Sequence, residues 1–138
     1  MLVLVDTPIW SLALRRTIKD LNPREQIKTG ALRELIRSGR AQLVGPIRQE
    51  LLSGIREEKA FRELRDYLRA FDEPVLEIAD YEDAADINNR CRSRGIAGSA
   101  IDFLICAIAV RRNWAVFTAD QDFARYARVF PLRLYDLG

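Results

Sequence analysis

The sequence predicts an α/β fold in which helices cover a mainly parallel sheet. Short segments with the pattern of buried strands alternate along the chain with longer segments of helical periodicity, as in α/β proteins. The first strand, residues 2–5 (LVLV), is apolar on both faces, which is typical of a parallel sheet between helices. The chain has 138 residues, 49% of them hydrophobic, and we expect a single domain over residues 1–138.

The segment up to Gly39 is predicted to form this strand and two helices. Directly after the strand, Thr7 and Pro8 fit the N-cap and the first position of a helix. A second helix is predicted over about residues 24–38, and Gly39 provides its C-terminal stop. The apolar residues at helical spacing in this helix are Ile27, Ala31 and Leu35.

The middle of the chain is predicted to contain a strand at residues 41–45 (AQLVG) and two helices. Pro46 begins the first of these helices, which contains Glu50 and is interrupted at Gly54. Residues 57–71 have the pattern of a long, highly charged amphipathic helix. Its predicted inner face consists of Phe61, Leu64 and Leu68, and Pro74 breaks it.

The last part of the chain is predicted to alternate between strands and helices. Residues 98–110 are apolar around the whole circumference of a helix, apart from Asp102 and small polar residues at the start, so this helix is expected to be buried. The other predicted elements are a strand at 75–78 (VLEI), a helix from Asp80 to about Arg94 that Gly95 ends, a strand at 115–118 (AVFT), a helical turn from Gln121 and a strand at 132–137 (LRLYDL).

The composition excludes several kinds of catalytic site. Histidine is absent, and the two cysteines, Cys91 and Cys106, do not have CxxC spacing. These absences exclude Ser-His-Asp and Cys-His catalysis and the usual zinc sites of cysteine and histidine. The formal net charge of +2 permits a polyanionic partner without requiring one. An enzyme with this composition is expected to use carboxylates, hydroxyls or a metal held by oxygen.

Two acids, Asp6 and Asp120, stand just beyond the ends of buried strands. Ligands of open α/β sheets bind outside the carboxyl ends of the strands, which is where both carboxylates would emerge. The alternative for each residue is a capping role at the start of the helix that follows. Asp122 is two residues further into the turn and is placed at the rim of the candidate site.

Two further acids, Asp102 and Glu50, lie in apolar helical segments. Asp102 carries a charge toward the interior, where an uncompensated charge costs several kcal/mol. Ser99 as N-cap, with Asp102 at the third helical position, is the alternative interpretation. Glu50 is read as a first-turn residue that favours the helix dipole, unless it joins the other acids. Carboxylates gathered at one sheet edge would demand a hard cation such as Mg²⁺ or Mn²⁺, which suits phosphodiester cleavage.

Four short motifs in order along the chain resemble those of a PIN domain, and more narrowly of a VapC-type toxin ribonuclease. The motifs are VDTPIWS, QELLSG, GSAIDFLICAIA and VFTADQDF, at residues 5–11, 49–54, 98–109 and 116–123. The resemblance covers essentially the whole chain. It implies a three-layer α/β/α sandwich with a central, mainly parallel sheet.

The resemblance also implies an activity, which is metal-dependent cleavage of structured RNA such as transfer RNA or ribosomal RNA. The catalytic acids would be Asp6, Glu50, Asp102 and Asp120, with Asp6, Asp102 and Asp120 holding Mg²⁺ or Mn²⁺. Thr118 would orient a water or a carboxylate behind these ligands, and Asp122 could assist or substitute for Asp120. Similar toxins bind a small antitoxin of the VapB type and commonly form homodimers.

Basic residues near the candidate site are expected to hold the RNA backbone. Arg90, Arg92 and Arg94 lead to the helix of Asp102 and are the first candidates, although cations at a helix C-terminus are equally explained by the helix dipole. Weaker candidates are Arg15, Arg16, Arg111 and Arg112. The chain lacks a membrane-length apolar run and the pattern of a signal peptide, so we expect it in the cytoplasm.

Two other functions remain as alternatives. A phosphatase of the haloacid dehalogenase type also begins with an aspartate after an apolar strand, but needs a second aspartate where this chain has Pro8. A non-catalytic module that binds RNA or protein would use the acids only as helix caps. Dependence of RNA cleavage on a metal ion separates this module from the nuclease.

Overall fold

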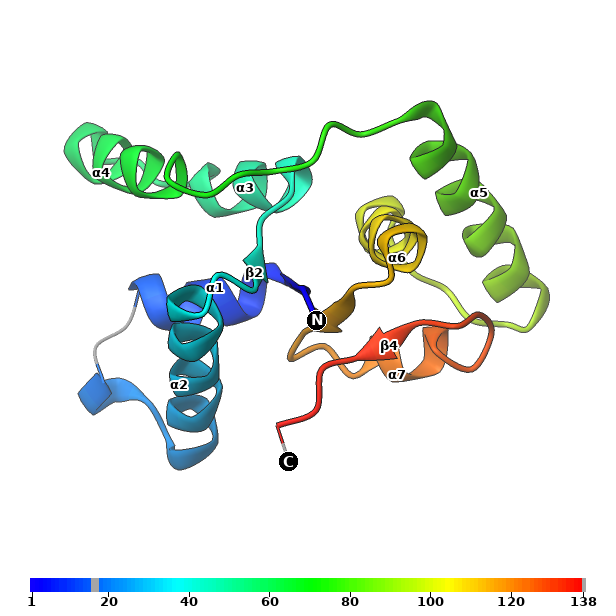
Figure 1. The fold of residues 1–138 in the computed structure, drawn as a ribbon, viewed down its shortest axis with the longest axis horizontal. Coiled ribbons are helices and arrows are strands. Elements are labelled where there is room, and N and C mark those ends of the chain that lie inside the picture. Colours follow the sequence, from blue (N-terminus) through cyan, green and yellow to red (C-terminus); the bar gives the residue numbers. More distant parts are fainter. Residues whose placement is uncertain (16–17, 138) are drawn as a thin grey trace.

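The computed structural model of the protein describes residues 1–15 and 18–137 and places a parallel sheet at its centre. Figure 1 shows how helices surround the strands. The elements are β1 (Val3–Val5), α1 (Thr7–Arg15), η1 (Ile18–Asp20), α2 (Pro23–Arg37), β2 (Ala41–Gln42), α3 (Gly45–Leu52), α4 (Glu58–Leu68), α5 (Ile78–Ser93), α6 (Ala100–Arg112), β3 (Ala115–Phe117), α7 (Asp122–Tyr126) and β4 (Arg133–Leu134).

The four strands of the sheet are parallel and have the order β2-β1-β3-β4. In the register, Val3 of β1 lies opposite Ala41 of β2 on one side and Ala115 of β3 on the other. Val5, the last residue of β1, lies opposite Phe117, the last residue of β3. The two central strands therefore end side by side, and the residues that follow them emerge at the same edge.

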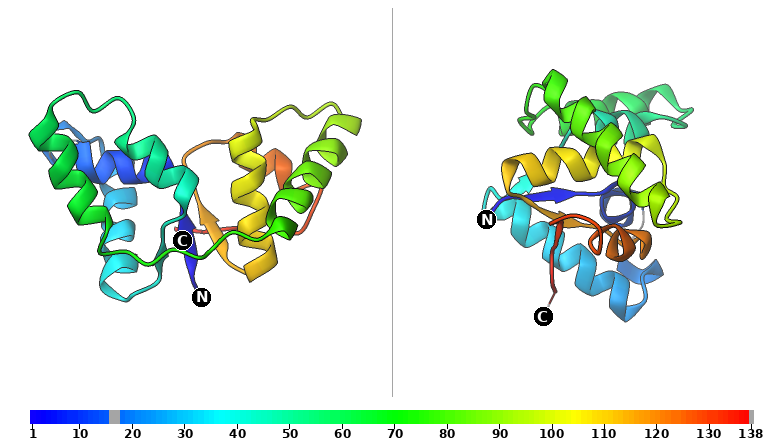
Figure 2. Two further views of the ribbon diagram at one scale, coloured as in Figure 1. Left: turned by 90° about the horizontal axis from the view of Figure 1, so that it is seen from above. Right: turned by 90° about the vertical axis from the view of Figure 1, so that its right-hand side faces the viewer.

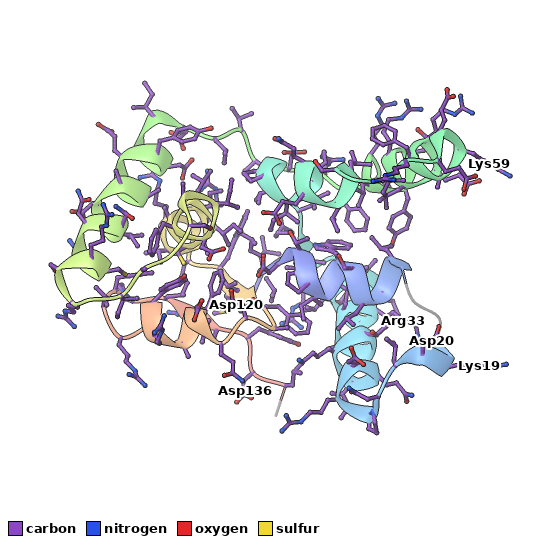
Figure 3. All side chains as sticks on the ribbon, turned by 180° about the vertical axis from the view of Figure 1, so that it is seen from behind. Lys19, Asp20, Arg33, Lys59, Asp120 and Asp136 are labelled. Carbon is purple, nitrogen blue, oxygen red and sulfur yellow. The ribbon has the colours of Figure 1, made fainter. Side chains whose placement is uncertain are left out.

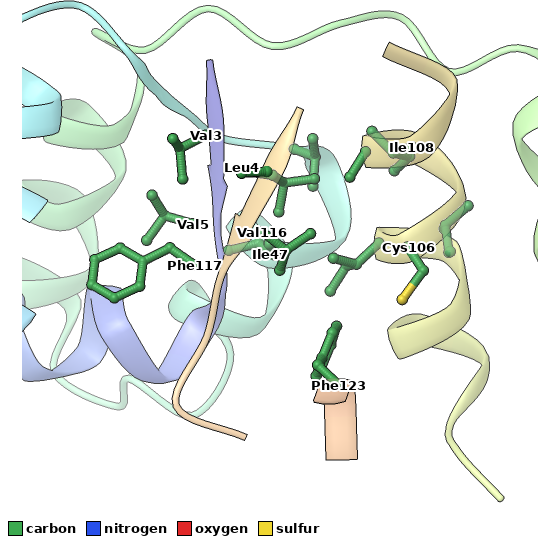
Figure 4. Close-up of a cluster of buried hydrophobic side chains, with 14 of the residues drawn as sticks. Val3, Leu4, Val5, Ile47, Cys106, Ile108, Val116, Phe117 and Phe123 are labelled. Atoms are coloured by element: carbon green, nitrogen blue, oxygen red, sulfur yellow. The ribbon is translucent and has the colours of Figure 1, made fainter. Parts of the chain in front are cut away.

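Strand β1 is buried on both faces, as the run of apolar residues predicts. Val3, Leu4 and Val5 have no exposed surface. Figure 4 shows Val3 and Val5 on one side of the strand and Leu4 on the other, where it faces α6. This alternation places apolar side chains against helices on both faces, so the sheet is the middle layer of the sandwich.

The helices form the two outer layers. The right-hand view of Figure 2 shows α6 on one side of the strands and α2 on the other. Residues 103–109 of α6 are all buried, because α6 lies between β3 and α5. These observations confirm the predicted three-layer α/β/α fold with a parallel central sheet. No helix in the described part of the chain is long and apolar enough to cross a membrane.

The predicted strand at residues 75–78 is wrong. Residues 73–77 have no regular structure, and α5 begins at Ile78. Val75 and Ile78 are 87% and 79% exposed, and of this run only Leu76 packs against the core. Figure 2 shows the segment crossing from α4 to α5, away from the edges of the sheet. Local strand propensity is not realised here because no partner strand is within reach.

Several predicted boundaries and faces also differ from the structure. Helix α1 begins at Thr7 itself, and the carbonyl of Asp6 accepts hydrogen bonds from the N–H groups of Ile9 and Trp10 (3.1 and 3.4 Å). Thr7 is therefore a helical residue and not the N-cap. Ile27, one of the apolar residues at helical spacing in α2, is 59% exposed. Only residues 133–134 of the predicted strand at 132–137 join the sheet.

Candidate active site

The four predicted acids come from four different elements that meet at the carboxyl edge of the sheet. Asp6 follows β1, and its N–H donates to the carbonyl of Phe117 at 2.8 Å, which continues the strand pairing by one residue. Asp120 follows β3. Glu50 lies on α3, and Asp102 lies in the first turn of α6. In Figure 3, Asp120 lies near the middle of the molecule, whereas Lys19 and Lys59 lie at its outer edge.

The carboxylate of Asp6 is buried and held by two neutral donors. Its Oδ1 accepts a hydrogen bond from the backbone N–H of Thr7 at 2.9 Å, and its Oδ2 accepts one from the Thr118 hydroxyl at 2.7 Å. Burial raises the pKa of Asp6, these hydrogen bonds oppose the rise, and the negative charges of Asp102 and Glu50 add to it. Asp6 is only 6% exposed, so its charge is poorly solvated.

Two threonines, Thr7 and Thr118, connect Asp6 to the acids on either side. The Thr7 hydroxyl donates to Oε2 of Glu50 at 2.6 Å, while the N–H of the same residue binds Asp6. The Thr118 hydroxyl donates to Asp6 and accepts from the backbone N–H of Asp120 at 3.0 Å. Thr7 therefore contacts both Glu50 and Asp6, and Thr118 contacts both the Asp6 carboxylate, which it orients, and the backbone of Asp120.

Asp102 has both a capping geometry and a place in the acid cluster. Its backbone N–H donates to the Ser99 hydroxyl at 3.0 Å, so Ser99 is the N-cap of α6 as predicted. Its Oδ2 accepts a hydrogen bond from the Tyr126 hydroxyl at 3.2 Å. Burial raises the pKa of Asp102, hydrogen bonds from Tyr126 and Ser99 oppose the rise, and the charge of Asp120 adds to it. The cap does not explain why the carboxylate lies beside other carboxylates.

Asp120 and Asp122 have different surroundings. Oδ1 of Asp120 accepts the backbone N–H of Asp122 at 2.9 Å, which forms a local turn like the predicted cap. The N-cap position of α7 is Gln121, however, and not Asp120. The carboxylate of Asp122 lies 3.4 Å from Arg125 and is half exposed. Asp122 therefore contacts the cluster through its backbone, and its carboxylate forms a half-exposed ion pair with Arg125.

The position of Glu50 on α3 differs from the expectation. The first turn of α3 has no acidic residue, because the helix begins at Gly45 and Glu50 lies beyond that turn. The helix dipole therefore does not explain this glutamate. Glu50 lines a pocket of about 590 Å³ between α3, α5 and α6. The other lining residues are Gly45, Pro46, Gln49, Ser53, Leu76, Tyr81 and Ile101.

The acid cluster has no neutralising cation from the described residues. None of the lysines and arginines there forms an ion pair with Asp6, Glu50, Asp102 or Asp120. As the side chains lie, no three described aspartate, glutamate or cysteine residues form a group that could hold a metal ion. Their oxygens instead accept hydrogen bonds from hydroxyl and amide groups. The donor set consists of carboxylate oxygens, which is the chemistry that Mg²⁺ and Mn²⁺ prefer.

Thr7 and Tyr126 contact the acids but were not predicted as site residues. The sequence pattern around Thr7 is typical of a helix start, and this pattern gives no indication of its hydrogen bonds to Asp6 and Glu50. Tyr126 lies at the end of a short helix, where an aromatic residue in an apolar pattern predicts only packing. For Tyr126 no local signal exists, because its partner Asp102 is 24 residues away.

The predicted basic residues fall into two groups. Arg111 and Arg112 bind the buried Asp80 at 2.9 and 2.7 Å, so both are engaged in this ion pair, and RNA binding by them stays a prediction. Arg90 pairs with Asp86 at 3.0 Å, and Arg94 reaches the carbonyl of Arg128 at 3.5 Å. Arg90, Arg92 and Arg94 are all exposed near the loop that leads to α6. Arg16 and the side chain of Arg15 lie outside the described residues.

The fold and this edge of the sheet define the class of protein as an α/β domain with a carboxylate site beyond the ends of parallel strands. The chain matches the PIN domain family over residues 3–129 and belongs to that family. PIN domains are typically nucleases that use divalent metal ions. Membership of this family leaves no support for the haloacid dehalogenase alternative.

Solved structures with the same fold cover nearly the whole chain. FitAcB from Neisseria gonorrhoeae has a TM-score of 0.75 and 20% identity, over 99% of this chain and 98% of that chain. VapBC2 from Rickettsia felis, bound to a DNA fragment from their promoter, has a TM-score of 0.76 and 16% identity, over 98% of both chains. VapBC-1 from nontypeable Haemophilus influenzae has a TM-score of 0.70 and 17% identity, over 99% of this chain and 98% of that chain. At these identities the likeness establishes the fold.

Proposed function

We propose that the protein is a Mg²⁺- or Mn²⁺-dependent endoribonuclease. The observation that carries this proposal is the meeting of Asp6, Glu50, Asp102 and Asp120 at one sheet edge, without an ion-paired cation from the described residues. Burial is the main cause that raises the pKa of Asp6 and Asp102, and the charges of neighbouring carboxylates add to it; a divalent cation would stabilise these poorly solvated charges. In this proposal all four acids are catalytic.

The ligands of the ion would be Asp6, Asp102 and Asp120. A bound ion would supply an activated water molecule and neutralise charge on the scissile phosphate. Thr118 holds the Asp6 carboxylate in place, and Thr7 holds Asp6 and Glu50 together. Glu50 is exposed and can turn toward an ion, whereas Asp6 is fixed by its two donors. Asp122 contributes its backbone N–H to Asp120 and is not needed as a ligand.

Metal dependence is the test of this activity. Cleavage of a structured RNA, such as a transfer RNA, should occur with Mn²⁺ or Mg²⁺ and stop in excess chelator. Asp102→Asn should reduce cleavage about 1,000-fold, because transition-state charge stabilisation of several kcal/mol is lost. Asp66→Asn, an exposed acid on α4, is the matched control and should cleave normally. Cleavage that persists in chelator would refute the proposal.

The RNA backbone would contact the exposed arginines at the C-terminal end of α5. Arg92 is exposed, and within the described residues it forms no ion pair, so its charge is available to phosphate. Replacing Arg92 and Arg94 with alanine should weaken RNA binding and reduce its dependence on salt concentration by roughly one to two units of log–log slope. An unchanged slope would exclude both residues from the RNA surface.

We also propose that the protein is the toxin of a toxin–antitoxin pair and forms a homodimer. The support is the fold shared with the VapBC structures, together with an open pocket beside Glu50 that a segment of a VapB-type antitoxin would cover. Co-purification with the product of a neighbouring small reading frame, and loss of RNA cleavage in that complex, would test the antitoxin. Light scattering on the isolated chain would test the dimer.

The non-catalytic binding module remains a second candidate because of one observation. The carboxylates of Asp6 and Asp120 already accept backbone N–H groups, and the N–H of Asp102 is capped by Ser99. In such a module the same acids would only stabilise helix starts. RNA binding without cleavage, under saturating Mn²⁺, would favour this candidate over the nuclease.

A further inference from the structure

We propose that Tyr126 is a positioning residue for Asp102, and that Gly98 is required because it leaves space for the Tyr126 hydroxyl. The proposal rests on the proposed function, since it concerns how one of the metal-binding carboxylates is held. The geometry points to a carboxylate that is restrained from its own helix and from α7. Oδ2 of Asp102 accepts the Tyr126 hydroxyl at 3.2 Å, and Ser99 also donates to the same carboxylate.

Tyr126 is fixed by packing on two sides. It has no exposed surface, and its ring lies 5.0 Å from that of Phe103 and 5.2 Å from that of Phe123, measured between centroids. Phe103 is the residue after Asp102, so the aromatic pair links α7 to the first turn of α6. A buried ring with two aromatic neighbours loses little additional entropy when its hydroxyl points at a fixed acceptor.

A tyrosine at this position supplies a hydrogen bond without a positive charge. Arginine or lysine would neutralise Asp102 and would compete with a divalent ion for the carboxylate. A phenol instead restrains the carboxylate and leaves its negative charge in place. Residues that hydrogen-bond to metal-ligating carboxylates orient them in this way, and their loss typically costs 10- to 100-fold in metal affinity.

Gly98 provides the space that the hydroxyl occupies. A Cβ atom at this position would overlap the Tyr126 hydroxyl and would lie 2.7 Å from Cζ of Phe103. These separations are too short for real carbon contacts, so the aromatic pair would have to move. The backbone of Gly98 has no left-handed conformation, and only the close approach of Tyr126 and Phe103 explains why a side chain is excluded.

The test compares Mn²⁺ affinity in four purified full-length proteins by titration calorimetry. Tyr126→Phe removes only the hydroxyl and should weaken Mn²⁺ binding about 10-fold or more, with kcat for RNA cleavage reduced and KM unchanged. Gly98→Ala should weaken binding similarly by displacing the hydroxyl. Tyr67→Phe is the matched control, because Tyr67 also packs against a phenylalanine but lies on α4, and its affinity should equal that of the unaltered chain.

A double variant separates positioning from a general loss of stability. Gly98→Ala combined with Tyr126→Phe should bind Mn²⁺ no more weakly than Tyr126→Phe alone, because both changes remove the same hydrogen bond. If Tyr126→Phe lowers the urea midpoint without metal and leaves Mn²⁺ affinity unchanged, Tyr126 is only structural and the inference is overturned. If the unaltered chain itself fails to bind Mn²⁺, the proposed function falls and this inference falls with it.

Discussion

Two buried aspartates, Asp80 and Asp6, have different partners, and their pKa values are shifted in opposite directions. Asp80 has no exposed surface. It accepts one hydrogen bond from Arg111 at 2.9 Å, two from Arg112 at 2.7 and 3.0 Å, and one from the backbone N–H of Glu77. Its hydrogen bonds to Arg112 dominate and lower its pKa to about 2, against the opposing effect of burial. Asp6 is almost as buried, has only a hydroxyl and an amide as donors, and its pKa is raised.

The difference shows where the fold leaves a charge uncompensated. The chain supplies two arginines of α6 to the buried carboxylate of Asp80 on α5, so that ion pair is complete without any ligand. At the carboxyl edge of the sheet, the described residues supply donors without charge, and the neighbouring acids increase the imbalance. A buried carboxylate with a raised pKa and only neutral donors, such as Asp6, is typical of a functional site. A buried carboxylate bound by arginines, such as Asp80, is typical of a structural ion pair.

The largest expected effect on stability follows from breaking the Asp80 ion pair. Asp80→Asn leaves two arginine side chains against a buried amide and should reduce the free energy of unfolding by about 3 kcal/mol. Urea denaturation without metal measures this loss. Asp83→Asn is the control, because Asp83 is half exposed at 3.6 Å from Arg111, and it should cost less than about 0.5 kcal/mol. Equal losses in the two variants would contradict the comparison.

Metal should stabilise the protein through the acid cluster alone. At a Mn²⁺ concentration of 100 times its dissociation constant, the free energy of unfolding should rise by about 2.7 kcal/mol. Asp102→Asn should abolish this gain. Asp80→Asn should retain it, although its free energy of unfolding without metal is lower. The measurement is urea unfolding with and without Mn²⁺. A gain that survives in Asp102→Asn would place the ion elsewhere.

Removal of a charge from the cluster should not destabilise the metal-free protein. Asp102→Asn keeps an oxygen for the Tyr126 hydroxyl and removes repulsion from Asp120, so its free energy of unfolding at neutral pH should equal that of the unaltered chain or exceed it by up to about 1 kcal/mol. A loss of about 1 kcal/mol or more would instead identify Asp102 as a simple helix-capping residue.

The smallest expected effect is on the pH dependence of the free energy of unfolding, which should have opposite signs for the acid cluster and for Asp80. Asp6 and Asp102 have raised pKa values, so the unfolded chain binds fewer protons than the folded one above the ordinary aspartate pKa, and their contribution to stability falls as pH rises from there. Asp80 contributes stability that is complete above the ordinary pKa and is lost as pH falls toward about 2. Without metal, the free energy of unfolding of Asp102→Asn should decline less toward neutral pH than that of the unaltered chain.

The sequence predicts the fold where the signal is local. The run at residues 2–5 predicts a doubly buried strand because burial on both faces requires apolar residues at every position, and β1 has this burial. The run at residues 75–78 also has strand propensity, although Glu77 interrupts its apolar residues, and it lies on a crossing segment. Whether a strand-forming segment finds a partner depends on the path of the whole chain, so propensity alone could not exclude this strand.

The candidate site shows the same limit. Asp6 and Asp120 could be predicted to meet because parallel strands end at a common edge. The roles of Asp80, Arg111 and Arg112 could not be predicted, because their ion pair joins residues more than thirty positions apart on two helices. The pattern of each helix alone indicates exposed charge. The hydroxyl of Tyr126 was missed for the same reason, since the contact arises only when α7 packs on α6.

The central position of β1 has a consequence for how the protein is synthesised. Asp6 leaves the ribosome before Thr118, which holds its carboxylate and follows 112 residues later. The neighbouring strand β3 that carries Thr118 into place is equally late. A nascent or prematurely released chain therefore lacks the hydroxyl, the last carboxylate and half of the strand pairing around Asp6, so incomplete translation products carry no assembled site.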